Sequence, residues 1–388
     1  MLNYQSCTWN EKLLLLLDDC DVIQNYAGSS IIDMLPDLVD FDGWSIQEET
    51  SQLLMNGIPQ RCRGGGINPY WERWPELRGK LTDSGDNHQQ QQSRHCRLFL
   101  GIGDGAAANC GSKCDAYSSS SDQRIAVTIG TSAAARICLP LPIHSDPIHV
   151  PPGLFCYRVD RHRVLVGGAL TDGGSVVEWI RNLFQLQTPS DFDAALEEAS
   201  EQYSDAITKE LNAQSLGGVT MIPFLSGERS TGFRSSASGC IAGITRNTTV
   251  VDILRSSFEG VTSRLGIVIG LIKDTCDALR GQNNISVTSE RGQLKLVASG
   301  GALERNSLWR QMIADCTGLD VVVDGDSNEG TSRGVAMLMA RSMNRTGRLE
   351  EELAVVCESL PNRDAESRWK QAIQNQETLI SAVSQTWR

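Results

Sequence analysis

The sequence predicts an α/β fold, most clearly in the region that follows Arg124. There, short runs rich in β-branched residues alternate with longer segments whose apolar residues recur every three or four positions. Strands and helices that alternate in this way favour a layered domain, with helices packed on a sheet. The length of 388 residues exceeds what one hydrophobic core usually supports, so we expect two domains, residues 1–122 and 123–388.

The predicted strands are short, and most of them end in glycine-containing turns or polar stretches. Two of them flank the polar stretch Asp160–Arg163, which is typical of a hairpin. The expected strands are Ile125–Ile129, Phe155–Arg158, Val164–Val166, Lys295–Ala298 and Asp320–Val323.

Two of the predicted helices begin with a capping-box pattern, in which a Ser or Thr precedes an acidic residue by three positions. These pairs are Ser175 with Glu178 and Thr249 with Asp252. The helix that follows Thr249 is the longest, and its apolar stripe should face the core. The stripe comprises Val250, Leu254, Phe258, Val261, Leu265, Val268 and Ile272.

Three more helices are expected over Trp309–Cys316, Gly334–Ala340 and Glu366–Val383. By contrast, residues 1–100 look irregular, and the low-complexity stretches Asp83–Ser93 and Ser118–Ser121 predict solvated loops. The leucine run at residues 13–17 is too short for a membrane span and has acidic flanks, so it indicates an amphipathic helix.

The net charge of −12 argues against broad affinity for nucleic acid or anionic membranes. The twelve cysteines have no spacing typical of a disulfide framework, which favours reduced thiols in a cytoplasmic protein. Cys110 and Cys114 form one closer pair, but a metal or redox site would need further ligands nearby.

Three glycine-containing turns have features suited to a phosphorylated ligand. In Gly101–Gly105, Asp104 lies between two glycines, where its carboxylate could orient a hydroxyl, accept its proton and hold Mg²⁺. Gly130–Ser132 offers hydroxyls and amides to phosphate oxygens, and Ser299–Ala302 lets a flat ligand approach the backbone. Each turn alone also has an ordinary explanation, namely a self-bonded Asp turn or close strand–helix packing.

The order of these segments resembles that of the FGGY family of carbohydrate kinases over nearly the whole chain. This resemblance implies the actin-like, ribonuclease-H-like ATPase fold, with a complete C-terminal domain and a truncated first domain. The matching segments are Gly103–Ser112, Thr128–Ser132, Gly167–Gly174, Pro223–Ser230, and Ser299–Ala302 followed by Leu308–Asp315.

The resemblance also implies roles for individual residues. Asp104 would be the general base and the Mg²⁺ ligand, and together with Gly103 it would contact the sugar. The residues expected to bind ATP are Gly130, Thr131, Gly174, Gly301 and Ala302, with Arg305 and Asn306 competing for one adenosine contact.

The implied activity is ATP-dependent phosphorylation of a sugar or sugar acid. Gluconate is the first expectation, because Gly103–Asn109 and Arg73–Leu77 look most like gluconokinase-type members; xylulose and ribulose are rivals. One departure matters: the family's first phosphate loop, of the form Asp-x-Gly-Thr, does not occur in this sequence. The alternative is therefore a catalytically impaired nucleotide-binding protein or a truncated gene product. An incomplete first domain would also expose apolar surface and favour self-association.

Overall fold

The computed structural model describes residues 102–115, 123–141, 148–159, 163–208, 218–281, 294–325, 330–342, 353 and 355–387, and four two-residue strands before them. The predicted leucine-rich helix, the two low-complexity loops and Arg73–Leu77 lie outside these residues. The chain divides into two compact units, Met1–Leu38 with Ile102–Arg388, and Val39–Gly101. The boundary after residue 122 stays a prediction.

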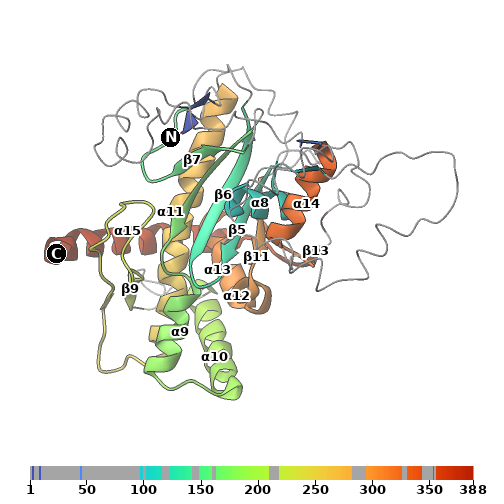
Figure 1. The fold of residues 1–388 in the computed structure, drawn as a ribbon. Coiled ribbons are helices and arrows are strands. Elements are labelled where there is room, and N and C mark those ends of the chain that lie inside the picture. Colours follow the sequence, from blue (N-terminus) through green and yellow to red (C-terminus); the bar gives the residue numbers. More distant parts are fainter. Residues whose placement is uncertain are drawn as a thin grey trace, which may run out of the picture. The chain divides into compact units, whose positions relative to one another are not determined.

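A mixed sheet forms the centre of the larger unit (Figure 1), and its strand order is β13-β12-β11-β5-β6-β8-β7. β5, β11 and β12 run parallel, whereas the remaining pairs are antiparallel. This confirms the predicted strands and the hairpin between β7 and β8. The bounds are β5 Arg124–Ile129, β6 Ala133–Pro140, β7 Phe155–Arg158, β8 Arg163–Leu170, β11 Lys295–Ser299, β12 Val321–Asp324 and β13 Val355–Ser359.

Shorter strands form three separate antiparallel pairs among the described residues. One pair consists of β9 and β10, which flank the Pro223–Ser230 region in sequence. The pairs are β1 Leu2–Asn3 with β2 Thr8–Trp9, β3 Trp44–Ser45 with β4 Arg97–Leu98, and β9 Thr220–Ile222 with β10 Cys240–Ala242.

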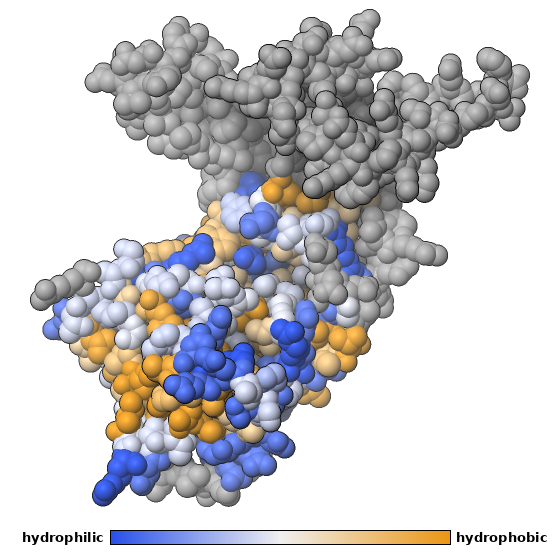
Figure 2. All heavy atoms as spheres, turned by 60° about the horizontal axis from the view of Figure 1, so that its bottom comes forward, coloured by the Kyte–Doolittle hydropathy of each residue, from blue (hydrophilic) through white to orange (hydrophobic). Residues whose placement is uncertain are grey.

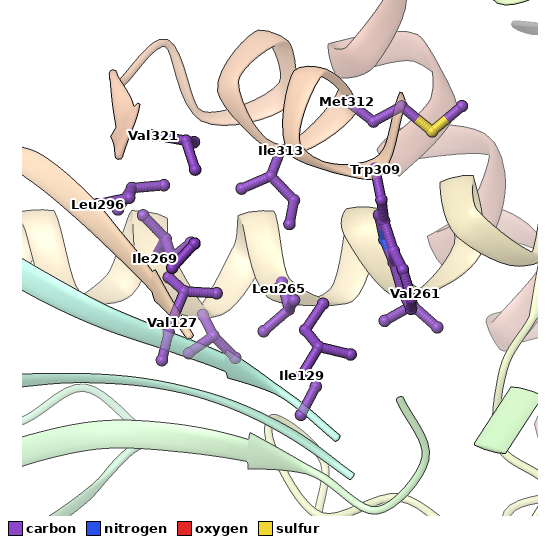
Figure 3. Packing of buried hydrophobic residues seen from close by; sticks show 14 of the residues in the cluster. Val127, Ile129, Val261, Leu265, Ile269, Leu296, Trp309, Met312, Ile313 and Val321 are labelled. Atoms are coloured by element: carbon purple, nitrogen blue, oxygen red, sulfur yellow. The ribbon is translucent and has the colours of Figure 1, made fainter. Parts of the chain in front are cut away.

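Helices cover both faces of the sheet. Successive side chains of a strand point to opposite faces, so apolar residues on both faces need a covering layer. On β5, Ile125, Val127 and Ile129 join the main core, while Ala126 belongs to a second cluster with Cys114. In Figure 3, Val127 and Ile129 face Val261 and Leu265 of the long helix α11. The main core thus lies between the sheet and α11, and the opposite face belongs to α8 and α14.

The helices agree with most of the predictions. The longest, α11, has the predicted capping box: the Asp252 amide donates to Thr249 Oγ1 at 3.2 Å, and the Thr249 amide donates to the Asp252 carboxylate at 2.8 Å. Its stripe is buried from Leu254 onward. The bounds are α8 Asp104–Gly111, α9 Gly174–Leu183, α10 Pro189–Thr208, α11 Val250–Gly281, α12 Gly301–Arg305, α13 Ser307–Thr317, α14 Gly330–Ser342 and α15 Glu366–Val383.

The capping box predicted at Ser175 is wrong. Helix α9 begins at Gly174, its N-cap is Gly173, and no side chain caps it. The Ser175 hydroxyl instead donates to the carboxylate of buried Asp172 at 3.1 Å. The Ser175 hydroxyl, which the sequence pattern assigns to the helix cap, thus bonds the carboxylate of Asp172, a residue outside the helix.

Two short 3₁₀ helices, η2 Arg363–Ala365 and η3 Ser384–Thr386, precede and follow α15. Among the described residues, no helix is both long and apolar enough to cross a lipid bilayer.

Candidate active site

The turn between β5 and β6 is joined to the start of α9 by backbone hydrogen bonds. The Gly174 amide donates to the Gly130 carbonyl at 2.7 Å, and the amides of Gly173 and Ser175 donate to the Thr131 carbonyl at 2.8 and 3.2 Å. A Cβ on Gly174 would lie 2.6 Å from the Gly130 oxygen, so only glycine allows this approach. The turn is held rigidly, while the Thr131 side chain stays exposed.

A second turn lies beside the first, because β5 and β11 are parallel neighbours with Thr128 opposite Ser299. The hydroxyls of these two residues are 2.9 Å apart. Gly300 continues the turn with φ of 95°, and a Cβ there would lie 2.6 Å from the Ile129 carbonyl oxygen. The carboxyl ends of the two strands therefore bring Gly130 and Thr131 next to Gly301 and Ala302.

The two residues that compete for the predicted adenosine contact have different environments. Asn306 caps α13, its side chain accepting the Trp309 amide at 2.9 Å, and it is buried. Arg305 is exposed, and one of its guanidinium nitrogens lies 2.9 Å from where a Gly301 Cβ would be. Arg310 donates to the carbonyls of Leu303 and Glu304, which ties α12 to α13. Arg305 is thus the one that faces the turn.

Asp104 is the first residue of helix α8 and is exposed. Its Oδ1 accepts the Gly105 amide at 2.7 Å, so the local backbone bond expected of an Asp turn is present at the start of a helix. The helix is positioned by close packing on α14, where a Cβ on Gly111 or Gly334 would overlap the backbone of the other helix. Asn109 links α8 to β6 by donating to the Arg136 carbonyl at 3.4 Å.

Arg136 and Tyr157 lie against the first turn of α8, and the motifs did not identify them. A Cβ on Gly105 would lie 2.9 Å from the Tyr157 hydroxyl and 3.3 Å from Arg136 Nε. Burial lowers the pKa of Arg136, an effect that Tyr157 and Asp104 oppose and Arg229 reinforces. The available signal was one arginine inside the otherwise apolar run Ala133–Leu139.

The segment Pro223–Ser230 is anchored to the site by two buried carboxylates. Asp172 accepts the Ser226 amide at 2.7 Å and also bonds Ser175 at the start of α9. Glu228 pairs with Arg264 of α11 at 3.0 Å and with Arg234 at 2.6 Å. This network connects the segment to the long helix, and it leaves Arg229 exposed near Arg136.

The predicted site residues fall into two groups along β6. The residues predicted to bind the nucleotide lie at the turns before β6 and after β11, whereas Asp104 lies beside Arg136, three residues past the start of β6. At about 3.3 Å per residue, this separation is about 10 Å along the strand. Within the described part of the chain, no three His, Cys, Asp or Glu side chains form a cluster that could hold a metal ion, which includes the surroundings of Cys110 and Cys114.

Solved structures of sugar kinases share this fold. A gluconate kinase from Lactobacillus acidophilus aligns with a TM-score of 0.65 at 19% identity, covering 100% of this chain and 63% of that protein. A ligand-bound xylulose kinase from the same organism aligns with a TM-score of 0.64 at 20% identity, with the same coverage of each chain. The likeness confirms the predicted α/β, actin-like ATPase fold.

The sequence has curated relatives among the same enzymes. A gluconokinase from Bacillus licheniformis is 28% identical over 256 residues, which cover 65% of this chain and 44% of the relative. A xylulose kinase from Staphylococcus xylosus is 26% identical over 224 residues, or 56% of this chain and 39% of the relative. The chain therefore spans less than half the length of these relatives.

The strongest assignment comes from the region that carries the two turns, the Pro223–Ser230 segment and α11 to α14. Residues 125–343, more than half of the chain, match the C-terminal domain of the FGGY family of carbohydrate kinases, and the chain belongs to that family.

Proposed function

We propose that this chain carries the ATP side of a carbohydrate kinase, which transfers the γ-phosphoryl group of ATP to a hydroxyl of a sugar or sugar acid. The observation that carries the proposal is the pair of adjoining turns, Gly130–Ser132 and Ser299–Ala302, at the carboxyl ends of parallel strands β5 and β11. Ligands of α/β proteins bind at such strand ends, where turns present amides and hydroxyls together.

In this proposal, ATP binds along the two turns. The exposed Thr131 hydroxyl and the turn at Gly130 contact the β- and γ-phosphates, and Gly174 leaves room for them beside α9. The adenosine packs on Gly301 and Ala302, where small side chains permit close contact. Of the two competing residues we favour Arg305, because the Asn306 side chain is already committed to its helix cap.

Asp104 is the proposed base, and with Gly103 it contacts the sugar. Its carboxylate lies exposed at the N-terminus of α8, where it can accept the proton of the attacking hydroxyl. A single exposed carboxylate fits Mg²⁺, since this ion usually takes one or two carboxylates and completes its shell with phosphate oxygens and water. When bound, Mg²⁺ would neutralise charge on the transferred phosphoryl group.

The acceptor is the least constrained part of the proposal. Gluconate comes first, since two gluconokinases match 256 and 260 residues of this chain, against 224 for a xylulose kinase; xylulose and ribulose follow.

A direct assay tests this function. The purified chain is incubated with Mg·ATP and gluconate, xylulose, ribulose or glycerol, and the phosphorylated sugar is quantified against a reaction without enzyme. The Asp104→Asn variant should lower the rate at least about 100-fold while ATP affinity, measured by calorimetry, stays within twofold.

Two other outcomes are informative. ATP binding without transfer to any of the sugars would favour the catalytically impaired nucleotide-binding protein. Transfer that Asp104→Asn leaves unchanged would refute the assignment of Asp104 as the base.

A further inference from the structure

Arg136 is a charged side chain inside a sheet. The packing around it accommodates its aliphatic stem but supplies little to balance its charge. Arg136 lies on β6 and is half-buried. A Cβ on Gly167, the residue opposite in β8, would lie 3.0 Å from Arg136 Cγ. The two glycines Gly105 and Gly167 therefore leave space for the arginine stem between α8 and the sheet.

No ion pair or hydrogen bond joins the Arg136 guanidinium to another side chain within the described ranges, although Asp104 is close enough to act on its charge. Arg229 adds a second positive charge nearby. An arginine stays protonated even in such an environment, and a half-buried charge without a matched anion is costly. The arrangement is thus prepared for an anionic group supplied by a ligand.

The strand order of the sheet indicates which ligand would bind beside Arg136. The nucleotide turns are on β11, β5 and the start of β6, whereas Tyr157 belongs to edge strand β7, on the other side of β6 and β8. Arg136 lies against Tyr157 and the first turn of α8, about 10 Å along β6 from the start of that strand at Ala133. The guanidinium is therefore on the acceptor side of Asp104, away from the adenosine turn.

We propose that Arg136, assisted by the Tyr157 hydroxyl and Arg229, binds the carboxylate of the acceptor and so selects sugar acids over neutral sugars. The inference rests on the kinase function proposed above and names the substrate class of that site. A guanidinium offers a planar pair of N–H donors that matches a carboxylate, and such charge-assisted bonds are stronger than those to a neutral hydroxyl. A neutral sugar would offer no carboxylate to either arginine.

The test compares two ligands that differ in the carboxylate. Gluconate and glucitol have the same six-carbon hydroxylated chain, but glucitol has a terminal alcohol where gluconate has the carboxylate. Their dissociation constants are measured by calorimetry with saturating Mg·ADP, which prevents turnover. The wild-type chain should bind gluconate about 10- to 100-fold more tightly than glucitol.

Variants then locate the source of this preference. Arg136→Met keeps the stem that packs on Gly167 and should remove the preference by weakening gluconate alone, while ADP affinity stays unchanged. Arg136→Lys retains the charge without the paired donors and should keep part of it. Arg246→Met, an exposed arginine on the turn before α11, is the matched control and should change neither ligand.

The outcomes separate this inference from the kinase function. Equal affinity for the two ligands, no binding of either, or an equal loss of both in Arg136→Met would overturn it; the last result would mean that Arg136 only positions Asp104. Phosphoryl transfer to neutral sugars without a preference for gluconate would keep the kinase function and refute the inference. A gluconate preference without phosphoryl transfer would keep the inference and refute the kinase function.

Discussion

Charged residues at the start of a helix and inside the sheet carry most of the chemistry proposed here. Asp104 occupies the first position of α8, and Arg136 projects from a strand whose other residues are mostly apolar. The acidic residue was predicted from its place between glycines, but its basic neighbour was not. Their meeting depends on α8 folding back onto β6, which pairs residues 32 positions apart in sequence.

Glu259 is the buried residue with the clearest predicted effect on stability. It lies on α11 beside Arg255, with the two charged groups 3.2 Å apart. Burial raises its pKa from the ordinary value near 4.5 to about 7; the positive charge of Arg255 lowers the pKa, and the negative charge of Asp252 raises it further. Because the carboxyl is protonated more readily in the folded chain than in the unfolded one, folding is favoured at low pH.

The resulting prediction concerns Glu259→Gln. Between about pH 4.5 and 7 the folded wild-type chain binds more protons at this position than the unfolded chain, so its free energy of unfolding falls as pH rises. The variant lacks this titrating group, so its free energy of unfolding should not fall in this way. Relative to wild type, it should rise by on the order of 1–3 kcal/mol between pH 5 and pH 8. Urea unfolding at both pH values measures the difference. A parallel pH dependence in the two proteins would contradict the assignment.

At the scale of elements, hydrophobic periodicity predicted the existence of helices better than their contacts. The α11 stripe and its capping box agree with the structure because both depend on residues three or four apart in one helix. The α9 cap failed because Asp172, outside the helix, bonds the Ser175 hydroxyl. Helix α8 was not predicted at all, although its Ala106–Ala108 run has high helix propensity.

Two glycines of α11 should respond to alanine substitution with opposite changes in the free energy of unfolding. A Cβ on Gly270 would meet no atom within 4 Å, whereas one on Gly266 would lie 2.5 Å from Cys316 Sγ on α13. Both Ala substitutions improve helix propensity, so their difference reports packing alone. We expect Gly270→Ala to raise the free energy of unfolding by about 0.5–1 kcal/mol and Gly266→Ala to lower it by about 1–3 kcal/mol.

Chemical denaturation of the two variants, with ADP affinity as a check on the site, measures both effects. Stabilisation by Gly266→Ala would show that α11 and α13 are not in close contact at this position.

At the scale of the whole molecule, ligand binding should be visible in stability. Anything that binds the folded chain alone stabilises it, by about 2.7 kcal/mol at a ligand concentration 100 times the dissociation constant. Mg·ATP should therefore raise the melting temperature of the wild-type chain. In Gly174→Ala, at least about tenfold more ATP should be needed for the same rise in melting temperature. The added Cβ would push against the Gly130 carbonyl and displace the turn at Gly130–Ser132.

Thermal unfolding over a series of Mg·ATP concentrations measures this response, and Gly270→Ala is the control that should respond like wild type. An unchanged response in Gly174→Ala would place ATP elsewhere.

The molecule also exposes apolar side chains, as Figure 2 shows for one face, where hydrophobic areas lie among polar ones. On α9, Trp179 and Leu183 are 39% and 53% exposed. The self-association expected from the sequence stays a prediction.

The sequence alone determined the α/β class, most strands and helices, and an ordered set of motifs specific enough to indicate the kinase family. These features are local, since periodicity, capping pairs and glycine turns are read within a few residues. Tertiary structure decided which residues meet. The position of Arg136 beside Asp104 follows from α8 packing on β6, and the adjoining turns at Gly130 and Gly301 follow from the pairing of β5 with β11 in one sheet. That pairing joins residues up to 171 positions apart, such as Thr128 and Ser299, and no local pattern encodes it.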